Sequence, residues 1–412
     1  MNRCLSGANH DRVSQTIQSQ PLSTTNAITV SLEPLIWRPG AAINGSARGI
    51  YEPGPEIRYH SKTLRTRVRP FRRLALCAAL GVLFFGIRVP LQADDFVNGR
   101  LGEYLESLRV QTGIPGLAVA VVGRTDVLYE RGFGLDDIEK NIATRADSPM
   151  HLDGLTEMFS ASLAMRCVEQ GRISLENTVG QFKPNSPDAD LTLRQVLTYT
   201  GDGTYSYRPD RLAILLTVIR TCTNDSFRET LANLLDQNGM ADSVPGPDVI
   251  FLVPPAEGVL TSEFDRYSRI LGRLAVPYAV DGQRNATRTQ YSATTLTPTS
   301  GLISTVDNIA KFDIGLKSGI VIQKDTLAQA WRASGGPHGI GWFVQPYNSE
   351  YVVWQFGSGD NGSSSMFVTL PARSITMILT ANSTGLVKGF GLNGGDIMSS
   401  PFARAFLGLY AP

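Results

Sequence analysis

The hydrophobic pattern predicts a helix followed by a β-hairpin at the start of the regularly patterned part of the chain. Over residues 94–112, apolar side chains recur at the spacing of an amphipathic helix, on Phe96, Leu101, Leu105 and Leu108. Two short apolar runs rich in β-branched residues follow, at 117–122 and 127–134. The residues between them, Gly123-Arg-Thr-Asp126, are typical of a turn, so we expect the two runs to pair as antiparallel strands.

The remaining pattern predicts a helical section between two parts of one sheet. Helical spacing extends over 150–170, 191–199 and 210–240, and 241–300 is irregular. A short helix is then predicted over 308–316, followed by strand-like runs over 351–356, 364–370 and 376–381. A last helix is predicted over 403–409. A chain that leaves a sheet and later returns to it predicts an α/β (α+β) fold with a helical insertion. We therefore expect one domain over 94–412, with the sheet in about 94–148 and 301–412 and the helical part in about 149–300.

The segment 65–93 has the composition of an export signal. A cluster of arginines precedes the apolar run Leu74–Ile87, and a short stretch then ends at Ala93. This run is shorter than the roughly 20 residues that span a bilayer as a helix, so we interpret the segment as a signal peptide cleaved after Ala93. The alternatives are an uncleaved membrane anchor and a buried helix of a larger domain. The pair Arg72-Arg73 is compatible with the twin-arginine route.

Residues 1–64 show no sustained period and are dense in Gly, Pro, Ser, Thr and Asn. We interpret them as a mis-called N-terminal extension or a disordered tail. The export signal predicts a secreted or periplasmic protein, attached to a membrane only if the signal is not cleaved. In such an oxidising compartment Cys167 and Cys222 are able to form a disulfide. We expect instead that the two thiols are buried separately in a large core.

Composition excludes several classes of function. The 412 residues carry 38 basic and 37 acidic side chains, a formal net charge of +1, and no basic stripe with interleaved aromatic residues, so we expect no nucleic-acid partner. The four histidines and the cysteines do not fall at zinc-ligand spacing, so we expect no metal site and no cofactor.

Five local strings resemble the serine β-lactamase and penicillin-binding-protein family, which includes class C β-lactamases, D-alanyl-D-alanine carboxypeptidases and esterases. In chain order they are Gly113-Ile-Pro-Gly-Leu-Ala-Val-Ala120, Cys167-Val-Glu-Gln-Gly-Arg-Ile-Ser-Leu175, Leu193-Arg-Gln-Val-Leu-Thr198, Ser300-Gly-Leu-Ile-Ser-Thr-Val-Asp-Asn-Ile-Ala-Lys-Phe312 and Gly339-Ile-Gly-Trp-Phe343. The resemblance covers about 100–410. It implies an antiparallel sheet flanked by the N- and C-terminal helices, with the active site beside the helical part.

The resemblance also implies a Ser-x-x-Lys motif at the start of the central helix, where the lysine takes the proton of the nucleophilic serine. The motif falls on Gly154-Leu-Thr-Glu157, so glycine stands where the serine is expected and glutamate where the lysine is expected. No serine in the chain lies three residues before a lysine. We interpret Glu157 as an acid in the first helical turn, favoured there by the helix dipole, rather than as a new base.

Two further family motifs are also altered. The Tyr-x-Asn motif corresponds to Tyr205-Ser-Tyr207, in which a ring replaces the amide that holds the substrate; a tyrosine packed in a surface loop is the alternative for Tyr205. The Lys-Thr-Gly motif corresponds to Phe356-Gly-Ser358, followed by Gly359. Phe356 is expected to be a core residue, and Gly359 retains a backbone N–H that could face an oxyanion.

These losses predict an exported, non-catalytic member of the family that binds an unidentified small molecule or protein in its remodelled cleft. The first alternative is a serine hydrolase with a displaced nucleophile, Thr156 or Ser160. The second is a decayed or misread gene product without a selected function.

Overall fold

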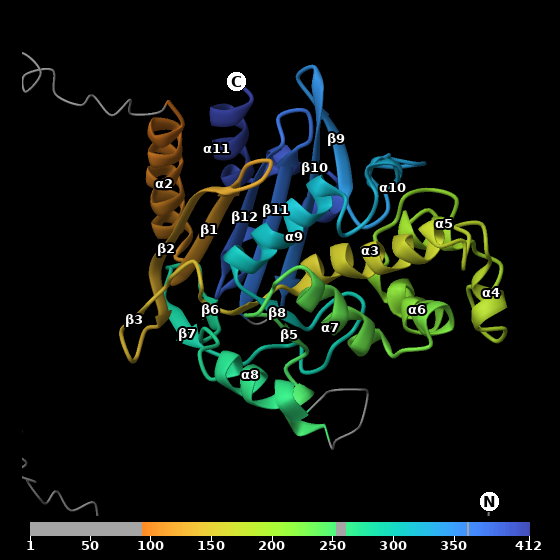
Figure 1. Cartoon of the computed structure of the whole chain (residues 1–412). Helices are drawn as coiled ribbons and strands as arrows, with labels where there is room; N and C mark the ends of the chain where they lie inside the picture. The colour runs from red at the N-terminus through yellow and green to blue at the C-terminus, as the bar shows by residue number, and fades with distance from the viewer. Residues whose placement is uncertain (1–92, 253–260, 361) are drawn as a thin grey trace, which may run out of the picture. The chain divides into compact units, whose positions relative to one another are not determined.

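The computed structural model describes residues 93–252, 261–360 and 362–412, and its centre is a seven-stranded antiparallel sheet (Figure 1). The strand order is β3-β2-β1-β12-β11-β10-β9. The strands are β1 (Gly116–Val122), β2 (Val127–Asp137), β3 (Ile142–Ala143), β9 (Phe343–Tyr347), β10 (Glu350–Gly359), β11 (Ser363–Leu370) and β12 (Ile375–Ala381). The predicted hairpin is confirmed as β1 and β2, and the three later strand predictions as β10, β11 and β12. The predicted segments 1–64 and 65–93 lie outside the described residues, except for Ala93.

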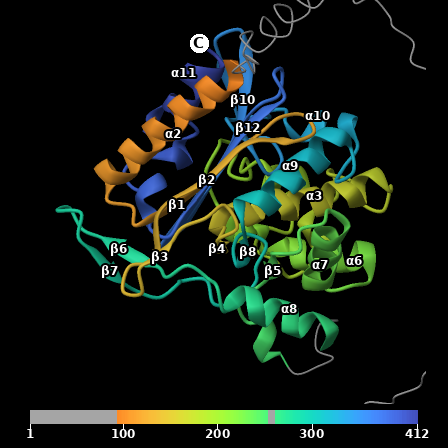
Figure 2. The same cartoon turned by 60° about the vertical axis from the view of Figure 1, so that its left-hand side comes forward.

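Helices cover both faces of the sheet, so the central strands are buried on both sides. Helices α2 (Ala93–Thr112) and α11 (Pro401–Tyr410) lie side by side on one face, as Figure 2 shows, and α3 (Thr156–Glu169) and α9 (Val306–Ser318) cover the other. Leu117, Val119 and Val121 pack with the first pair of helices, whereas the alternate residues of β1 pack with the second pair. Burial on both faces explains why β1 is a continuous apolar run.

The helical section follows β3 and extends to β8, after which the chain returns to the sheet at β9. Its elements are β4 (Met150–His151), η1 (Asp153–Leu155), α3, α4 (Val179–Phe182), α5 (Leu193–Leu197), η2 (Pro209–Ile214), α6 (Leu215–Thr223), α7 (Phe227–Gln237), β5 (Val244–Pro245), η3 (Val249–Phe251), α8 (Thr261–Leu271), β6 (Tyr278–Val280), β7 (Ala286–Arg288) and β8 (Leu302–Ser304). Strand β8 pairs with both β4 and β5, which ties the section together beneath the sheet. The mixed α/β fold with a large antiparallel sheet is therefore confirmed.

Several element predictions were wrong in detail. The helix predicted over 150–170 begins only at Thr156, because β4 and η1 precede it. The helix predicted over 210–240 is divided where Asn224 ends α6 in the left-handed conformation, with φ of 66°. The section predicted to be irregular contains α8, and the sequence analysis missed α10 (Lys324–Ala330) and β9. Strand β9 lies at the sheet edge, where Pro346 is tolerated although it weakens the strand signal.

The cysteine prediction was also wrong, because Cys167 of α3 and Cys222 of α6 form a disulfide. The bond joins two helices of the insertion across 55 residues of sequence. Both cysteines belong to the large core between the sheet and the helical section. No helix within the described ranges is long and apolar enough to cross a membrane.

Candidate functional site

Gly154 lies in η1, where the backbone of β10 leaves no room for a side chain. A Cβ atom added to Gly154 would lie 2.5 Å from the carbonyl oxygen of Phe356 and 3.2 Å from the Cα of Gly357. Real Cβ atoms essentially never approach a backbone atom closer than 3.0 Å. Ser365 fixes this approach from the next strand, because its Oγ donates a hydrogen bond of 2.5 Å to the carbonyl oxygen of Leu152. The position at which the resemblance puts the nucleophile is therefore packed against a strand.

This contact predicts that Gly154→Ser destabilises the protein. Overpacking a tight site typically costs 1–3 kcal/mol, and we expect a loss of about 2 kcal/mol in the free energy of unfolding. Urea denaturation followed by circular dichroism measures it. Gly99→Ser is the matched control, because a Cβ at Gly99 in α2 meets nothing within 4 Å, and we expect no loss there. Equal stability of the two variants would contradict the closed geometry.

Glu157, in the first turn of α3, is a buried carboxylate held by three neutral donors. Its side chain accepts hydrogen bonds from the hydroxyl groups of Tyr199 at 2.7 Å and Tyr207 at 3.0 Å. The third donor is Nε2 of Gln355 in β10, at 3.1 Å. Only 2% of the residue is exposed. Glu157 thus joins α3 to the loop after α5 and to the sheet, which is more than the predicted role of a first-turn acid.

Burial raises the pKa of Glu157 to about 7, and the hydrogen bonds from Tyr199 and Tyr207 lower it only in part. A carboxyl group that titrates near neutral pH is a common property of general bases. A general base must also reach the proton that it takes, however, and the two tyrosines and Gln355 already cover both carboxylate oxygens. The geometry therefore favours a structural role in the closed site.

The two tyrosines of the predicted motif contact different parts of the molecule. Tyr207 contacts Glu157, whereas the hydroxyl of Tyr205 donates to the backbone carbonyl of Asn393 at 2.8 Å. Tyr199 completes the cluster, with its ring 4.9 Å from that of Tyr207 and 4.7 Å from that of His338. The sequence analysis did not single out Tyr199. A signal was available, since Tyr199 directly follows the family-like string that ends at Thr198.

Phe356 is a core residue, as predicted. It is only 8% exposed and lies with its ring 5.9 Å from Phe343 and 6.1 Å from Trp354. Its ring also lies 6.0 Å from Tyr207, so the aromatic cluster is continuous from the sheet to the helical section. Aromatic side chains therefore occupy the side of the site at which the resemblance puts a substrate-binding cation.

Gly359 faces an acid that the sequence analysis missed. A Cβ at Gly359 would lie 2.9 Å from each carboxylate oxygen of Asp153, and Ser363 donates to the same carboxylate at 2.6 Å. Asp153 adopts a left-handed backbone conformation with φ of 47°, and burial raises its pKa to about 6. A carboxylate beside Gly359 repels a developing oxyanion, so the predicted use of this backbone N–H is disfavoured. No sequence signal marked Asp153, because its partner lies 210 residues away.

The two alternative nucleophiles are both fully buried. The Oγ of Ser160 donates to the backbone carbonyl of Pro298 at 2.7 Å and of Thr156 at 3.1 Å. Within the described part of the chain, the hydroxyl of Thr156 has no hydrogen-bond partner. Neither hydroxyl is bonded to a base, which an activated nucleophile requires.

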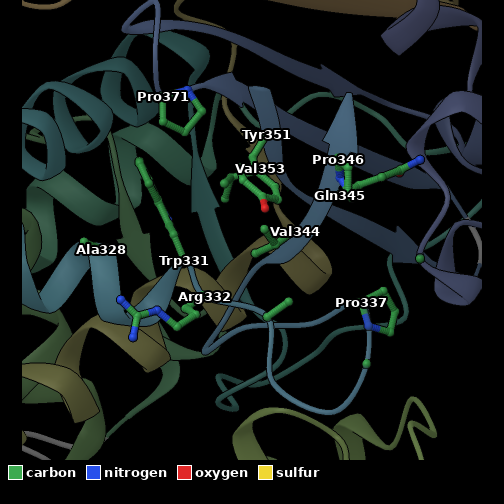
Figure 3. Close-up of a pocket in the computed structure, with 13 residues that line it drawn as sticks. Ala328, Trp331, Arg332, Pro337, Val344, Gln345, Pro346, Tyr351, Val353 and Pro371 are labelled. Atoms are coloured by element: carbon green, nitrogen blue, oxygen red, sulfur yellow. The ribbon is translucent and has the colours of Figure 1, made fainter. Parts of the chain in front are cut away.

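A cavity of about 610 Å³ lies around the edge strand β9 (Figure 3). Trp331, Tyr351 and Val353 line it together with Pro337, Pro346 and Pro371. None of the predicted site residues lines it. The described residues contain no cluster of three or more His, Cys, Asp or Glu side chains able to hold a metal ion.

Comparison with known proteins assigns the chain to a family. The family profile described as beta-lactamase matches residues 97–395. The chain belongs to the beta-lactamase family. Among curated relatives, the beta-lactamase of Psychrobacter immobilis is 26% identical over 146 residues, which cover 34% of this chain and 35% of that protein. Protein flp of Staphylococcus aureus is 23% identical over 93 residues, covering 21% of this chain and 19% of that protein. The chain thus matches only about a third or less of the length of these relatives.

Solved structures of a penicillin-binding protein homologue and of a class C beta-lactamase share the fold. The octameric penicillin-binding protein homologue from Pyrococcus abyssi aligns with a TM-score of 0.59 and 17% identity, over 75% of this chain and 77% of that one. The class C beta-lactamase from Rhodobacter sphaeroides aligns with a TM-score of 0.56 and 16% identity, over 69% of this chain and 94% of that one. At this level of identity the likeness establishes the fold, and the chemistry must be argued from the side chains.

Proposed function

We propose that this chain is an exported member of the beta-lactamase family that does not form an acyl-enzyme and acts by binding a ligand or protein partner. The observation that carries the proposal is the contact between Gly154 and β10. The position expected to carry the nucleophile has no side chain, and a Cβ added there would lie 2.5 Å from the carbonyl oxygen of Phe356. A substrate carbonyl has no space between these two segments.

The size of the expected effect supports this proposal. Removing the nucleophile alone from a serine hydrolase lowers turnover by roughly a million-fold. Here a buried glutamate also stands where the general base is expected, and Asp153 lies beside Gly359. Neither alternative nucleophile within the described ranges compensates for the missing hydroxyl, because Ser160 and Thr156 are buried without a base.

Export is supported by two independent features. The segment 65–93 has the composition of a signal peptide. Cys167 and Cys222 form a disulfide, a bond that persists in oxidising compartments and is rare in the cytosol. We therefore propose a secreted or periplasmic location.

Covalent labelling tests the absence of acyl-enzyme chemistry. The purified protein is incubated with a fluorescent penicillin and with a fluorophosphonate probe, alongside an active class C beta-lactamase. We expect labelling of the active enzyme and background fluorescence for this chain. Covalent label that maps to residues 153–160 would overturn the proposal, and its loss in Ser160→Ala or Thr156→Ala would identify a displaced nucleophile.

A further inference from the structure

The segment 198–208, hereafter the lid, connects α5 to η2 and crosses the start of α3. Its contacts with the rest of the molecule include ring contacts with His338, Phe343 and Phe356, and hydrogen bonds from three tyrosine hydroxyl groups. Tyr199 and Tyr207 both donate to the carboxylate of Glu157, and Tyr205 donates to the carbonyl of Asn393. Two of these three hydrogen bonds thus depend on a single titratable group.

Among the residues that the structure describes, no cation faces Glu157. The lid presents the three tyrosines, whose pKa values are all raised by burial, so they stay neutral well above pH 9. Strand β10 presents the amide of Gln355. His338, whose ring packs edge-on against Tyr199, has its pKa lowered to about 4 by burial and is neutral above pH 5. On the same side of the helix start, Asp153 is held by the hydroxyl of Ser363.

We propose that the lid is pH-sensitive: it closes over Glu157 while that residue is protonated and opens when Glu157 is ionised. An ionised carboxylate in this position has lost its hydration and gains only neutral hydrogen bonds in return. Release of the lid removes two tyrosine rings from the carboxylate, so water can reach it. The protonated acid has no such penalty, and its hydrogen-bonding needs are met by hydroxyl groups that rotate to donate or accept.

The size of the effect follows from proton linkage. In the closed state the pKa of Glu157 is about 7, and in the open, hydrated state it returns towards 4.5. For that pair of values, the ratio of open to closed molecules rises about 30-fold between pH 5.5 and pH 8.5. The increase occurs because the open state binds fewer protons than the closed state across this interval.

Hydrogen–deuterium exchange of the full chain, read by mass spectrometry, measures the lid directly. Exchange of the peptide covering 198–208 is followed at pH 5.5 and pH 8.5, with labelling times scaled to the intrinsic exchange rate at each pH. We expect the corrected rate of the lid to rise about 30-fold at pH 8.5. The peptide covering α9 should keep the same protection at both pH values.

Two variants distinguish opening of the lid by ionisation of Glu157 from a general loss of lid stability. Glu157→Gln keeps the size of the side chain but cannot ionise, so the lid should exchange equally at both pH values. Tyr205→Phe removes only the contact with Asn393, so exchange should rise at both pH values while the pH-dependent increase remains.

The wild-type result alone is sufficient to refute the proposal. A lid that exchanges at the same corrected rate at both pH values would show that ionisation of Glu157 does not open it, even if Glu157→Gln fails to fold. This outcome is distinguishable from failure of the proposed function, which would be seen as covalent labelling whether or not the lid moves.

Discussion

Removal of the disulfide between Cys167 and Cys222 is expected to lower the free energy of unfolding by about 4 kcal/mol. The bond closes a loop of 55 residues, so its loss releases a large amount of chain entropy in the unfolded state. The loop contains α4, α5, η2, most of α6 and the lid. The helical section should therefore be the part of the molecule most affected by reduction.

Urea denaturation of Cys167→Ala, Cys222→Ala and the double variant tests this expectation. Each single variant already breaks the bond, so we expect all three to lose a similar amount of stability rather than an additive amount. Peptide mapping after alkylation without reduction should find neither cysteine modified in the wild type. Two alkylated thiols at these positions, with unchanged stability in the variants, would contradict the disulfide.

Glu157 should make the protein less stable as the pH rises from 5 to 8. The folded-state pKa of about 7 exceeds the unfolded value of 4.5, so the folded protein binds more protons within this interval. The stabilisation is therefore complete below about pH 4.5 and is lost as the pH rises through about 7. Between pH 5 and pH 8 the expected loss from this group is about 2.5 kcal/mol.

The comparison with Glu157→Gln isolates this contribution. Burial also raises the pKa of Asp136, Asp153 and Asp313 to about 6, so the wild-type profile contains several titrations of the same sign. The two proteins share these three aspartates, so subtracting the stability of the variant from that of the wild type cancels their contributions. In urea denaturation at pH 5, 6, 7 and 8, the stability of the wild type relative to Glu157→Gln should fall by about 2.5 kcal/mol from the lowest to the highest pH. If Glu157 does not titrate in this range, the two proteins should differ by the same amount at every pH. A constant difference would refute the assignment.

The sequence allowed the family and the hairpin of β1 and β2 to be predicted. Local strings and apolar runs carry that information, because β1 is buried on both faces and the motif positions lie at fixed places along the chain. Helix α8 was missed although Phe264, Tyr267 and Ile270 repeat at three-residue spacing, because the surrounding Pro, Gly, Ser and Thr dominate the composition. A short amphipathic pattern is difficult to recognise where the surrounding residues are typical of loops.

The closed geometry of the site was not predictable, because it depends on pairs that are distant in sequence. The hydrogen bond from Gln355 to Glu157 joins residues 198 positions apart, and that from Tyr199 joins residues 42 positions apart. Replacement of a lysine by a glutamate suggested a lost base, and only the spatial arrangement revealed a carboxylate surrounded by neutral donors. In the same way, the sequence showed a glycine at 154 in place of the expected serine, and only the structure showed that the backbone of β10 packs against it.

A crystal structure of the protein at pH 5.5 tests the central claim most directly. The account predicts that the carbonyl oxygen of Phe356 lies in van der Waals contact with Gly154, and that the hydroxyl groups of Tyr199 and Tyr207 lie within hydrogen-bond distance of Glu157. An open cleft between η1 and β10, with a serine or threonine hydroxyl directed into it beside a lysine, would contradict the account.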